Sequence, residues 1–456
     1  MVNAISVCNR VPATWTWVPR LGKARRLPGK IVCLSGCRSE GDCFLFGACW
    51  ASISGSHISP VDAFFKKGCS MGHQGMRCGK TLLIWGLLTG FSLSFVVAAE
   101  NRFEGKVDSF LGDARLEIEQ VFKGDRFPNI AVATDGTVLA FFNGVRVRRS
   151  EDGGQTWGDE ITVGKGFMGG GVTVNEINGD IFAFVESQHP PAKLSLFRSS
   201  DHGKTWAETE CRLIENSLGH LPSMHMNEHG ITLRHGKHAG RLIRASRWYA
   251  GKNDRSLWPE HYTNAIYSDD GGKTWKASEP FPANGTGEAT LAELADGTLY
   301  YNSRRHWAPD GENPLRRWIA TSQDGGESWK GLALCETLPD GPQDTNYGCM
   351  GGLVRLPIEG KDILVYSNCD SPSGRRNGTV WVSFDGGKTW PLKRVVDEGT
   401  FAYSSMTAGR PNTPSEGTIY LQYESGGAKV ACFNLSWVLG GELTGDGDVP
   451  KEFSSQ

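Results

Sequence analysis

Short apolar runs, separated by glycine-rich and charged segments, make up most of the chain after residue 100. Residues 136–142 and 297–301 are typical, because each begins Gly-Thr and continues with β-branched or aromatic side chains. Runs of this length and composition predict β-strands. No long stretch of this part shows the 3.6-residue periodicity of an amphipathic helix. We therefore expect an all-β fold from about residue 114 to residue 437.

An eight-residue pattern, Ser-x-Asp-x-Gly-x-Thr-Trp, interrupts these runs five times, with Ser in place of Thr in the fourth copy. The copies occupy residues 150–157, 199–206, 268–275, 322–329 and 383–390. Ser and Asp side chains accept hydrogen bonds from backbone N–H groups in turns, and glycine adopts the positive φ that such turns need. The Trp buries a large apolar area beside the turn. We interpret the copies as structural hairpin turns rather than calcium sites, and call them Asp turns.

The spacing of the Asp turns predicts a repeat architecture. Successive Trp residues of the five copies are 49, 69, 54 and 61 residues apart, which is in the range of propeller blades. A span of roughly 320 residues at about 54 residues per blade gives six blades. We therefore predict a six-bladed β-propeller of four-stranded antiparallel blades over residues 100–440. The last blade is expected to lack an Asp turn, and residues 441–456 are expected to form a polar tail.

The first hundred residues differ from the rest of the chain. Residues 1–80 contain 11 Lys/Arg and 3 Asp/Glu, whereas an uncharged apolar run follows at 81–99 and ends in Val-Ala-Ala. A basic start, an apolar middle and a small-residue end are typical of a secretion signal. We predict a signal peptide or a single membrane anchor at 76–99, with export of everything that follows. Translation would then start at Met76 or Met71, and residues 1–75 would be a doubtful extension.

Composition excludes several classes of protein. A formal net charge of −2 gives no reason to expect a nucleic-acid partner, and a hydrophobic fraction of 39% argues against both wholesale disorder and a multi-spanning membrane protein. Of the 12 cysteines, only five follow residue 100. They are widely spaced and odd in number, so they predict neither a disulfide framework nor a zinc site. We expect no cofactor and no metal.

Repeated Asp turns in a six-bladed propeller resemble the sialidase (neuraminidase) superfamily of Asp-box, or BNR-repeat, propellers. The site residues of that family occur here in the family's order between the turns. The first-blade arginine of the family matches Arg126 in Asp-Arg-Phe-Pro-Asn, and the family's glutamate matches Glu288 in Gly-Glu-Ala-Thr. The second arginine matches Arg304. The third matches Arg375, with Arg376 as an alternative one residue away. The nucleophile of the family's Ala-Tyr-Ser element matches Tyr403.

The chemistry of sialic acid explains these residue types. Its anomeric carbon carries a carboxylate, which three arginines can hold through charge-assisted hydrogen bonds. A carboxylate nucleophile would be repelled there, whereas a neutral phenol is not, and sialidases use a Tyr nucleophile. The resemblance implies that Tyr403 is the nucleophile and Glu288 its base, and that Arg126, Arg304 and Arg375 bind the substrate carboxylate. We also expect the arginines to lower the pKa of the phenol.

The chain departs from the family at the acid/base. Sialidases place an Asp between a first-blade strand and the first Asp turn, but the corresponding segment here is short and holds no Asp or Glu. The proton donor to the leaving group therefore cannot be carried over from the resemblance. Glu186, on the next blade, is a candidate substitute, although a surface or strand-edge carboxylate without a catalytic role is the favoured interpretation. Asp125 and Asp344 are further candidates.

A histidine-rich segment contains a second motif. Residues 225–229 spell His-x-x-Glu-His, which binds zinc in one class of protease when it lies on a helix. Here Pro222 precedes the motif and Gly230 follows it, so turn and strand signals surround it. We favour a polar loop over a zinc site. By analogy with the family, His225 or Glu228 of this loop would contact the substrate.

Three functions remain open from the sequence. The first is an exported exo-sialidase that releases sialic or another nonulosonic acid from a sialylated glycan with retention. The second is a propeller that binds acidic sugars with little or no hydrolysis, because the usual acid/base Asp is missing. The third is a hydrolase of another sugar acid. The presence of both Tyr403 and Glu288 favours hydrolysis, and the missing Asp favours binding alone.

Overall fold

The computed structural model describes residues 103–124, 126–166, 170–223, 228–251, 254–344 and 348–453. The predicted extension 1–75 and the predicted signal or anchor at 76–99 lie outside the described residues, as do Asp125 and His225. In the part of the chain that is described, no helix is both long and apolar enough to cross a membrane.

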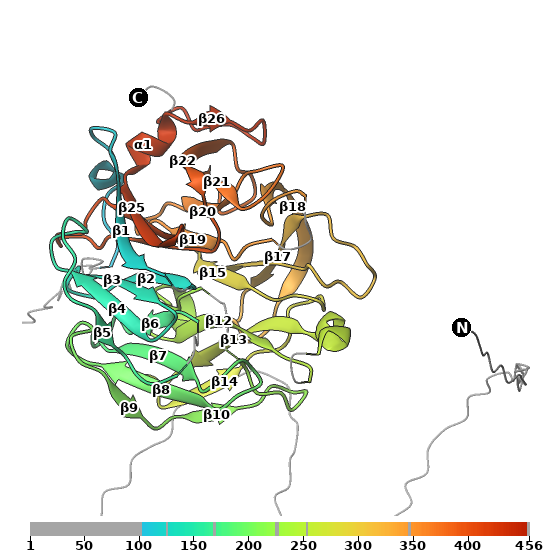
Figure 1. The fold of residues 1–456 in the computed structure, drawn as a ribbon. Helices are drawn as coiled ribbons and strands as arrows, with labels where there is room; N and C mark the ends of the chain where they lie inside the picture. Colours follow the sequence, from blue (N-terminus) through green and yellow to red (C-terminus); the bar gives the residue numbers. More distant parts are fainter. Residues whose placement is uncertain are drawn as a thin grey trace, which may run out of the picture. The chain divides into compact units, whose positions relative to one another are not determined.

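The described residues form six small sheets that follow one another around a central axis (Figure 1). Listed from the innermost strand outward, blade one comprises β2 (Pro128–Val132), β3 (Val138–Phe142), β4 (Arg146–Ser150) and β5 (Ile161–Thr162), and blade two comprises β6 (Val172–Val174), β7 (Ile181–Glu186), β8 (Leu194–Ser199) and β9 (Ala207–Thr209). Blade three comprises β11 (Ile231–Thr232), β12 (Leu242–Trp248), β13 (Tyr262–Ser268), β14 (Thr274–Ala277) and β10 (Arg212–Ile214).

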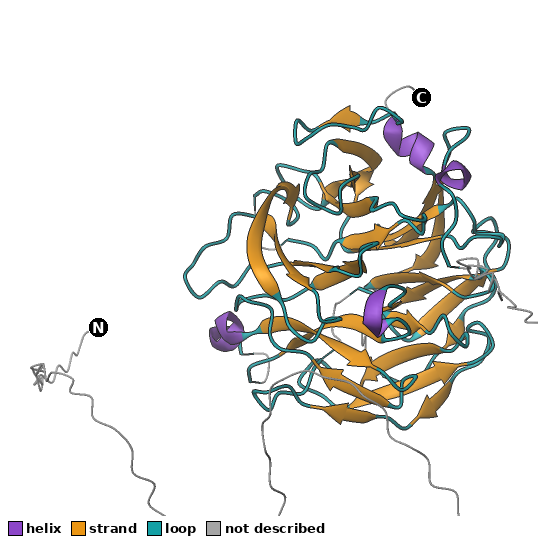
Figure 2. Ribbon diagram, turned by 180° about the vertical axis from the view of Figure 1, so that it is seen from behind, coloured by secondary structure: helices purple, strands orange, loops and turns teal. Residues whose placement is uncertain are grey.

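Blade four comprises β15 (Ala289–Glu293), β16 (Leu299–Ser303), β17 (Arg316–Ser322) and β18 (Lys330–Pro339). Blade five comprises β19 (Gly352–Arg355), β20 (Leu364–Cys369), β21 (Arg376–Ser383), β22 (Leu392–Thr400) and β26 (Glu442–Leu443), and blade six comprises β23 (Ser404–Ala408), β24 (Ile419–Glu424), β25 (Gly427–Phe433) and β1 (Leu116–Lys123). Helical segments are short (Figure 2): η1 (Val107–Phe110), η2 (Gly236–His238), η3 (Arg255–Glu260) and α1 (Leu435–Leu439). The predicted all-β, six-bladed propeller is confirmed.

Blade six is built from both ends of the described chain. Its outermost strand, β1, pairs antiparallel with β25 from Leu116↔Phe433 to Lys123↔Gly427, and the two strands lie side by side in Figure 1. In blades one to five the Asp turn joins the third strand to the fourth. In blade six these two strands are not consecutive in the sequence, so no hairpin links them. The sixth Asp turn is absent for this topological reason.

Two blades have a fifth strand that the sequence analysis did not predict. In blade three, β10 adds to the outer edge and runs parallel to β14. In blade five, β26 pairs with β22. The segment after residue 440, expected to be a polar tail, therefore contributes a strand, and Phe453 beyond it is buried and stacks on Phe384 with ring centroids 5.1 Å apart.

The Asp turns satisfy their own polar groups. In the first copy, the Ser150 hydroxyl donates to Asp152 Oδ1 (2.7 Å) and accepts from the Gly154 N–H (2.8 Å). The Thr156 N–H and hydroxyl both donate to the Asp152 carboxylate, at 2.9 and 2.5 Å. Although desolvation opposes the effect, the hydrogen bonds from Thr156 lower the pKa of Asp152 to about 2. The carboxylate thus acts as a structural acceptor within the turn.

The apolar core is divided among the interfaces between successive blades. Each of six buried clusters joins one blade to the next, and the turn tryptophans lie in or beside these interfaces. Trp275 of blade three is fully buried and packs edge-on against Phe182 and Phe184 of blade two. Burial of one Trp removes about 150–250 Å² from water, which is worth at most about 4–6 kcal/mol. The Asp turns therefore fix the spacing of the blades.

Candidate active site

The topology alone brings the five predicted site residues to one end of the propeller. In an antiparallel blade, the first and third strands start at the same end at which the second strand finishes. Arg126, Glu288 and Tyr403 precede the first strands of blades one, four and six, Arg304 follows the second strand of blade four, and Arg375 precedes the third strand of blade five. All five side chains therefore belong to one end of the central axis.

Tyr403 and Glu288 form a direct hydrogen-bonded pair. The Tyr403 hydroxyl donates to Glu288 Oε1 at 2.7 Å, and both residues are buried. Arg304 donates to the other oxygen of the same carboxylate. Desolvation opposes the ionised carboxylate, but the positive charge of Arg304 lowers the pKa of Glu288 below its ordinary value. Glu288 is therefore an ionised acceptor in contact with a phenol.

The other two predicted arginines flank the same phenol. The guanidinium carbons of Arg126 and Arg375 lie 5.0 and 5.1 Å from the centroid of the Tyr403 ring. Arg126 is held by Glu424, with Nε 3.2 Å from Oε1, and Arg375 donates to the Gly348 carbonyl at 2.8 Å. Arg126 and Arg375 thus lie close to Tyr403, and Arg304 contacts Glu288, the hydrogen-bond partner of Tyr403.

The pKa of the phenol differs from the sequence-based expectation. Burial, and after it the negative charge of Glu288, raise the pKa of Tyr403 well above its ordinary value, although Arg304 and Arg375 act in the opposite direction. The expected lowering by the arginines is outweighed because the phenol is buried and its hydrogen-bond partner, Glu288, is negatively charged. A neutral Tyr403 beside an ionised Glu288 is the arrangement in which a base is required to activate a nucleophile.

Two further residues support Arg304 and were missed by the sequence analysis. Asp340 accepts from Arg304 Nε at 3.2 Å and from Arg317 Nη1 at 2.9 Å, and all three side chains are buried. Arg317 also donates to the Asn302 side chain at 2.6 Å. A Pro-Asp-Gly sequence at the end of β18 is the one signal that could have drawn attention to Asp340.

A cavity of about 170 Å³ opens beside the Tyr403–Glu288 pair. Tyr403, Glu288 and Arg304 form one part of its wall. The rest comes from blades two, three and four and consists of aromatic and cationic side chains, namely His189, Arg247, Tyr249, Arg255, Trp258, His306 and Trp307. None of these seven was predicted, because they lie in strand ends and connections without a repeated pattern. The wall suits a polar ring with apolar faces and negative charge.

The described acid/base candidates do not line the cavity beside Tyr403. Glu186 is buried at the end of β7, where it accepts from the Ser223 hydroxyl at 2.6 Å, and it does not line the cavity. Asp344 is exposed and accepts from the Gly374 N–H at 3.1 Å. Asp125 lies outside the described residues. Among the described residues that line the cavity, Glu288 is the only carboxylate.

Glu228 and His229, the described residues of the His-x-x-Glu-His motif, belong to a largely buried network. His225 lies outside the described residues, but Glu228 is buried, 2.7 Å from His229 Nδ1, and accepts a hydrogen bond from the Ser405 hydroxyl. Within the described residues, no three His, Cys, Asp or Glu side chains are grouped to hold a metal ion. Because Ser405 follows Tyr403 by two residues, the network links this blade-three loop to the nucleophile segment of blade six.

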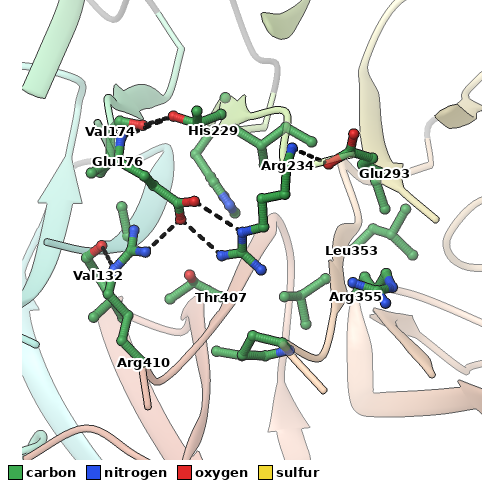
Figure 3. Close-up of a pocket in the computed structure, with 18 of the residues that line it drawn as sticks. Val132, Val174, Glu176, His229, Arg234, Glu293, Leu353, Arg355, Thr407 and Arg410 are labelled. Carbon is green, nitrogen blue, oxygen red and sulfur yellow. Dashed lines mark hydrogen bonds and ion pairs between the residues drawn. The ribbon is translucent and has the colours of Figure 1, made fainter. Parts of the chain in front are cut away.

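A second pocket lies at the other end of the inner strands (Figure 3). Its charged side chains follow or end the inner strands and are paired with one another. Arg234 donates to Glu176 at 2.8 and 2.9 Å, Arg410 also binds Glu176, and Glu293 accepts from the Arg234 N–H at 2.6 Å. Although desolvation opposes the effect, Arg234 and Arg410 lower the pKa of Glu176 to about 2. The two ion pairs of Glu176 tie blades two, three and six together, and the hydrogen bond to Glu293 adds blade four.

Comparison with known proteins assigns the chain to a family. Residues 143–420 match the model of a BNR repeat-like domain. A sialidase of Micromonospora viridifaciens is 33% identical over 369 residues, which cover 72% of this chain and 54% of that protein. An anhydrosialidase of Macrobdella decora is 26% identical over 269 residues, covering 55% of this chain and 32% of the relative. The chain thus spans about half the length of the first of these relatives.

Solved structures agree with the sequence comparisons. The Hadza microbial sialidase Hz136 superposes with a TM-score of 0.53 at 25% identity, covering 69% of this chain and 66% of that one. The intramolecular trans-sialidase from Ruminococcus gnavus superposes with a TM-score of 0.50 at 16% identity, covering 74% and 98% of the two chains, and supports the fold alone. Together with the six-bladed architecture and the matched repeat domain, these likenesses establish that the chain belongs to the sialidase superfamily of BNR-repeat propellers.

Proposed function

We propose that this propeller is an exo-acting glycoside hydrolase of the sialidase type, which releases terminal sialic acid or a related nonulosonic acid with retention of configuration. One observation carries the proposal: the Tyr403 hydroxyl donates to Glu288 at 2.7 Å, next to the guanidinium groups of Arg126, Arg304 and Arg375. A protein that only binds sugars gains nothing from a buried phenol paired with a base.

In the proposed reaction the three arginines bind the carboxylate on the anomeric carbon. Arg304 is fully buried and fixed by Glu288 and Asp340, so its guanidinium is already oriented before a ligand arrives. Arg126 is held by Glu424 and Arg375 by the Gly348 carbonyl, and the two complete the clamp. Preoriented charged donors of this kind bind an anion without a large reorganisation cost.

The covalent step uses the Tyr403–Glu288 pair. As the bond from the anomeric carbon to the aglycone oxygen breaks, the Tyr403 oxygen forms a bond to the same carbon and its proton passes to Glu288. The aglycone departs with a proton from the general acid, or as an anion that solvent protonates. Water then attacks the anomeric carbon of the glycosyl–tyrosine and gives its proton back to that acid or to solvent, while the proton on Glu288 returns to the phenolate, and the sugar leaves with its original configuration. Two displacements at one carbon give net retention.

Protonation of the leaving aglycone is the step with the least support. Glu186 stays the candidate proposed from the sequence, although its carboxylate bonds to Ser223 and does not line the cavity. Loss of general acid catalysis typically costs about 10²–10⁴ in rate. An aglycone that leaves readily as an anion is least affected, so we expect aryl sialosides to be better substrates than natural glycosides.

A second candidate function is a propeller that binds acidic sugars with little hydrolysis. The observation that favours it is the wall of the cavity, where Glu288 is the only carboxylate among the described lining residues. Hydrolysis of another sugar acid is a third candidate, since the arginines would hold any carboxylate on an anomeric carbon.

Turnover of an aryl sialoside beside sialyl-lactose separates these functions. Hydrolysis of both, or of the aryl sialoside alone, supports the hydrolase, whereas binding of sialyl-lactose without turnover of either supports the second candidate. Labelling with a 3-fluoro-sialosyl fluoride, followed by peptide mass spectrometry, tests the nucleophile, with Tyr403→Phe as the control. Full activity with an unlabelled Tyr403 would refute its assignment.

We also propose that the propeller is exported, with residues 76–99 as signal or single anchor. The proposal rests on the basic, apolar and small-residue order of that segment. N-terminal sequencing of the native protein tests it: a start at or near Glu100 supports a cleaved signal, and a peptide from residues 1–70 would contradict a start at Met76.

A further inference from the structure

We propose that Arg247 is a second anion-binding subsite of the cavity, which takes an anionic group of the substrate other than the carboxylate on the anomeric carbon. The preferred substrate would then be a sialoside with a second negative charge close to the scissile bond. This group is either the carboxylate of a neighbouring sialic acid or a sulfate ester. The inference rests on the proposed function, because it names the substrate class of the same site.

Arg247 is the exception among the buried arginines of the described chain. It is 5% exposed, yet no hydrogen bond or ion pair of its guanidinium to a described residue is present, and its Nε has no partner. The other described arginines that are at least nine-tenths buried all donate from their guanidinium groups to a carboxylate, an amide or a backbone carbonyl: Arg241, Arg244, Arg304, Arg305 and Arg317. A buried charge without a partner is costly, which indicates that a ligand completes its environment.

The guanidinium of Arg247 is nevertheless held in place. Its backbone exchanges two hydrogen bonds with Ser223, at 3.0 and 2.7 Å, and its guanidinium carbon lies 4.1 Å from the centroid of the Tyr249 ring. A Cβ atom placed on Gly287 would lie 3.5 Å from both terminal nitrogens of Arg247. Both terminal nitrogens of Arg247 therefore lie within contact distance of the backbone that carries Glu288. A fixed cation is prepared for an anion at this place.

The charges around the cavity favour a second anion rather than a neutral group. The described lining residues include Arg247, Arg255 and Arg304, against the single carboxylate of Glu288. Glu288 is already bonded to Arg304 and Tyr403. Arg247 interacts with Glu288 only through space. The substrate carboxylate is assigned to Arg126, Arg304 and Arg375, so it leaves Arg247 without an anion in hydrogen-bond contact among the described residues. An additional anionic group on the sugar or on the aglycone would restore the balance with a charge-assisted hydrogen bond.

The experiment compares three substrates in wild type, Arg247→Gln and Arg247→Lys. The substrates are 3′-sialyl-lactose, an α-2,8-linked disialyl-lactose that adds a carboxylate, and a sulfated 3′-sialyl-lactose that adds a sulfate ester. We expect kcat/KM of wild type to be higher for one or both doubly charged substrates. Arg247→Gln should lower kcat/KM for that substrate by roughly tenfold to a hundredfold, because a hydrogen bond to a charged group is lost. The change for 3′-sialyl-lactose should be small, and Arg247→Lys should retain part of the preference.

The same saccharides also test the subsite without hydrolysis. Their binding can be followed in the Tyr403→Phe background through the fluorescence of Trp258 and Trp307, which line the cavity. If no substrate is hydrolysed but Arg247→Gln still weakens binding of the doubly charged saccharides, the proposed function fails and the subsite stands. The subsite is refuted if wild type does not prefer a second charge in either assay. It is also refuted if folded Arg247→Gln keeps the preference or loses all three substrates equally.

Discussion

Glu288 has two separable roles that one substitution and a matched control can distinguish. Glu288→Gln keeps the size of the side chain but removes the charge that accepts the hydrogen bond of the Tyr403 hydroxyl and that pairs with Arg304. Without a base, a neutral phenol of raised pKa must attack unassisted. We therefore expect loss of activity and loss of stability from the same change, through different contacts.

The structure sets the size of each effect. Removal of a positioned base lowers rates by about 10²–10⁴, which corresponds to roughly 3–5 kcal/mol of activation free energy. Removal of one partner from a buried ion pair destabilises by about 3–5 kcal/mol, and here the lower end applies, because Arg304 keeps Asp340 at 3.2 Å. Since the pKa of Glu288 is lowered in the folded protein, its stabilisation is present above the unfolded-state pKa and is lost as the pH falls through the folded-state value.

Asp340→Asn is the matched control. It removes the other carboxylate from Arg304, and also one from Arg317, but it does not touch Tyr403. Because desolvation raises the pKa of Asp340 despite Arg304 and Arg317, urea denaturation should show a smaller loss for Asp340→Asn than for Glu288→Gln. With an aryl sialoside, at a temperature where both variants are folded, kcat of Glu288→Gln should fall by about 10²–10⁴ and that of Asp340→Asn much less. The unfolding free energy of Glu288→Gln should fall less steeply than that of wild type as the pH is lowered.

Equal loss of kcat in the two folded variants would refute this reasoning. It would mean that Glu288 acts only by positioning Arg304. A Glu288→Gln enzyme with near wild-type kcat would refute the role of the base as well. Both outcomes can be read only after circular dichroism has established that the variants are folded.

Two further substitutions test the frame around the site. Glu176→Gln removes the shared partner of Arg234 and Arg410 at the opposite end of the inner strands, so urea denaturation at pH 7 should show a loss of about 3 kcal/mol with kcat unchanged. Because the pKa of Glu176 is lowered from 4.5 to about 2, its contribution to stability is present above the unfolded-state pKa and declines as the pH falls toward 2. The difference in unfolding free energy between wild type and Glu176→Gln should therefore shrink in acid. A difference that does not change with pH would contradict the ion pairs. Gly378→Ala places a methyl group into the ring of Phe401, which precedes Tyr403 by two residues. It should lower the free energy of unfolding by about 1–3 kcal/mol and lower kcat as well. In the control, Gly158→Ala, the methyl group meets only ordinary contacts, and neither quantity should change.

Local patterns were sufficient for the blade count and for the positions of the five matched residues. The Asp turns can be recognised from the sequence because each one satisfies its own polar groups within eight residues, so the whole pattern lies in one short stretch. The matched residues stand at strand starts and ends whose order follows from the repeat. Because successive strands within a blade run in opposite directions, Glu288, Arg304 and Tyr403 must lie at one end of the axis.

Contacts between distant segments were not predictable in the same way. Arg247, Arg317 and Asp340 carry no spacing signal. Arg317 and Asp340 reach Arg304 through the paired strands of blade four, and Arg247 lines the same cavity from the end of β12 in blade three. Glu186 was chosen for its place in the sequence, but the structure turns its carboxylate to Ser223. The direction of the Tyr403 pKa depends on complete burial and on the distance to Glu288, neither of which a sequence specifies.

The closure of blade six by β1 also bears on how the chain folds. Leu116 and Phe433, which pair at one end of the closing ladder, are 317 residues apart in the sequence (433 − 116). During synthesis, β1 leaves the ribosome long before β25 exists, and its edge stays without a partner while the other blades form. Contacts of such long range are slow to form. Joining the ring should therefore be the last and slowest event of folding, and until then the nascent chain is an arc with two open sheet edges that are prone to pair with other molecules.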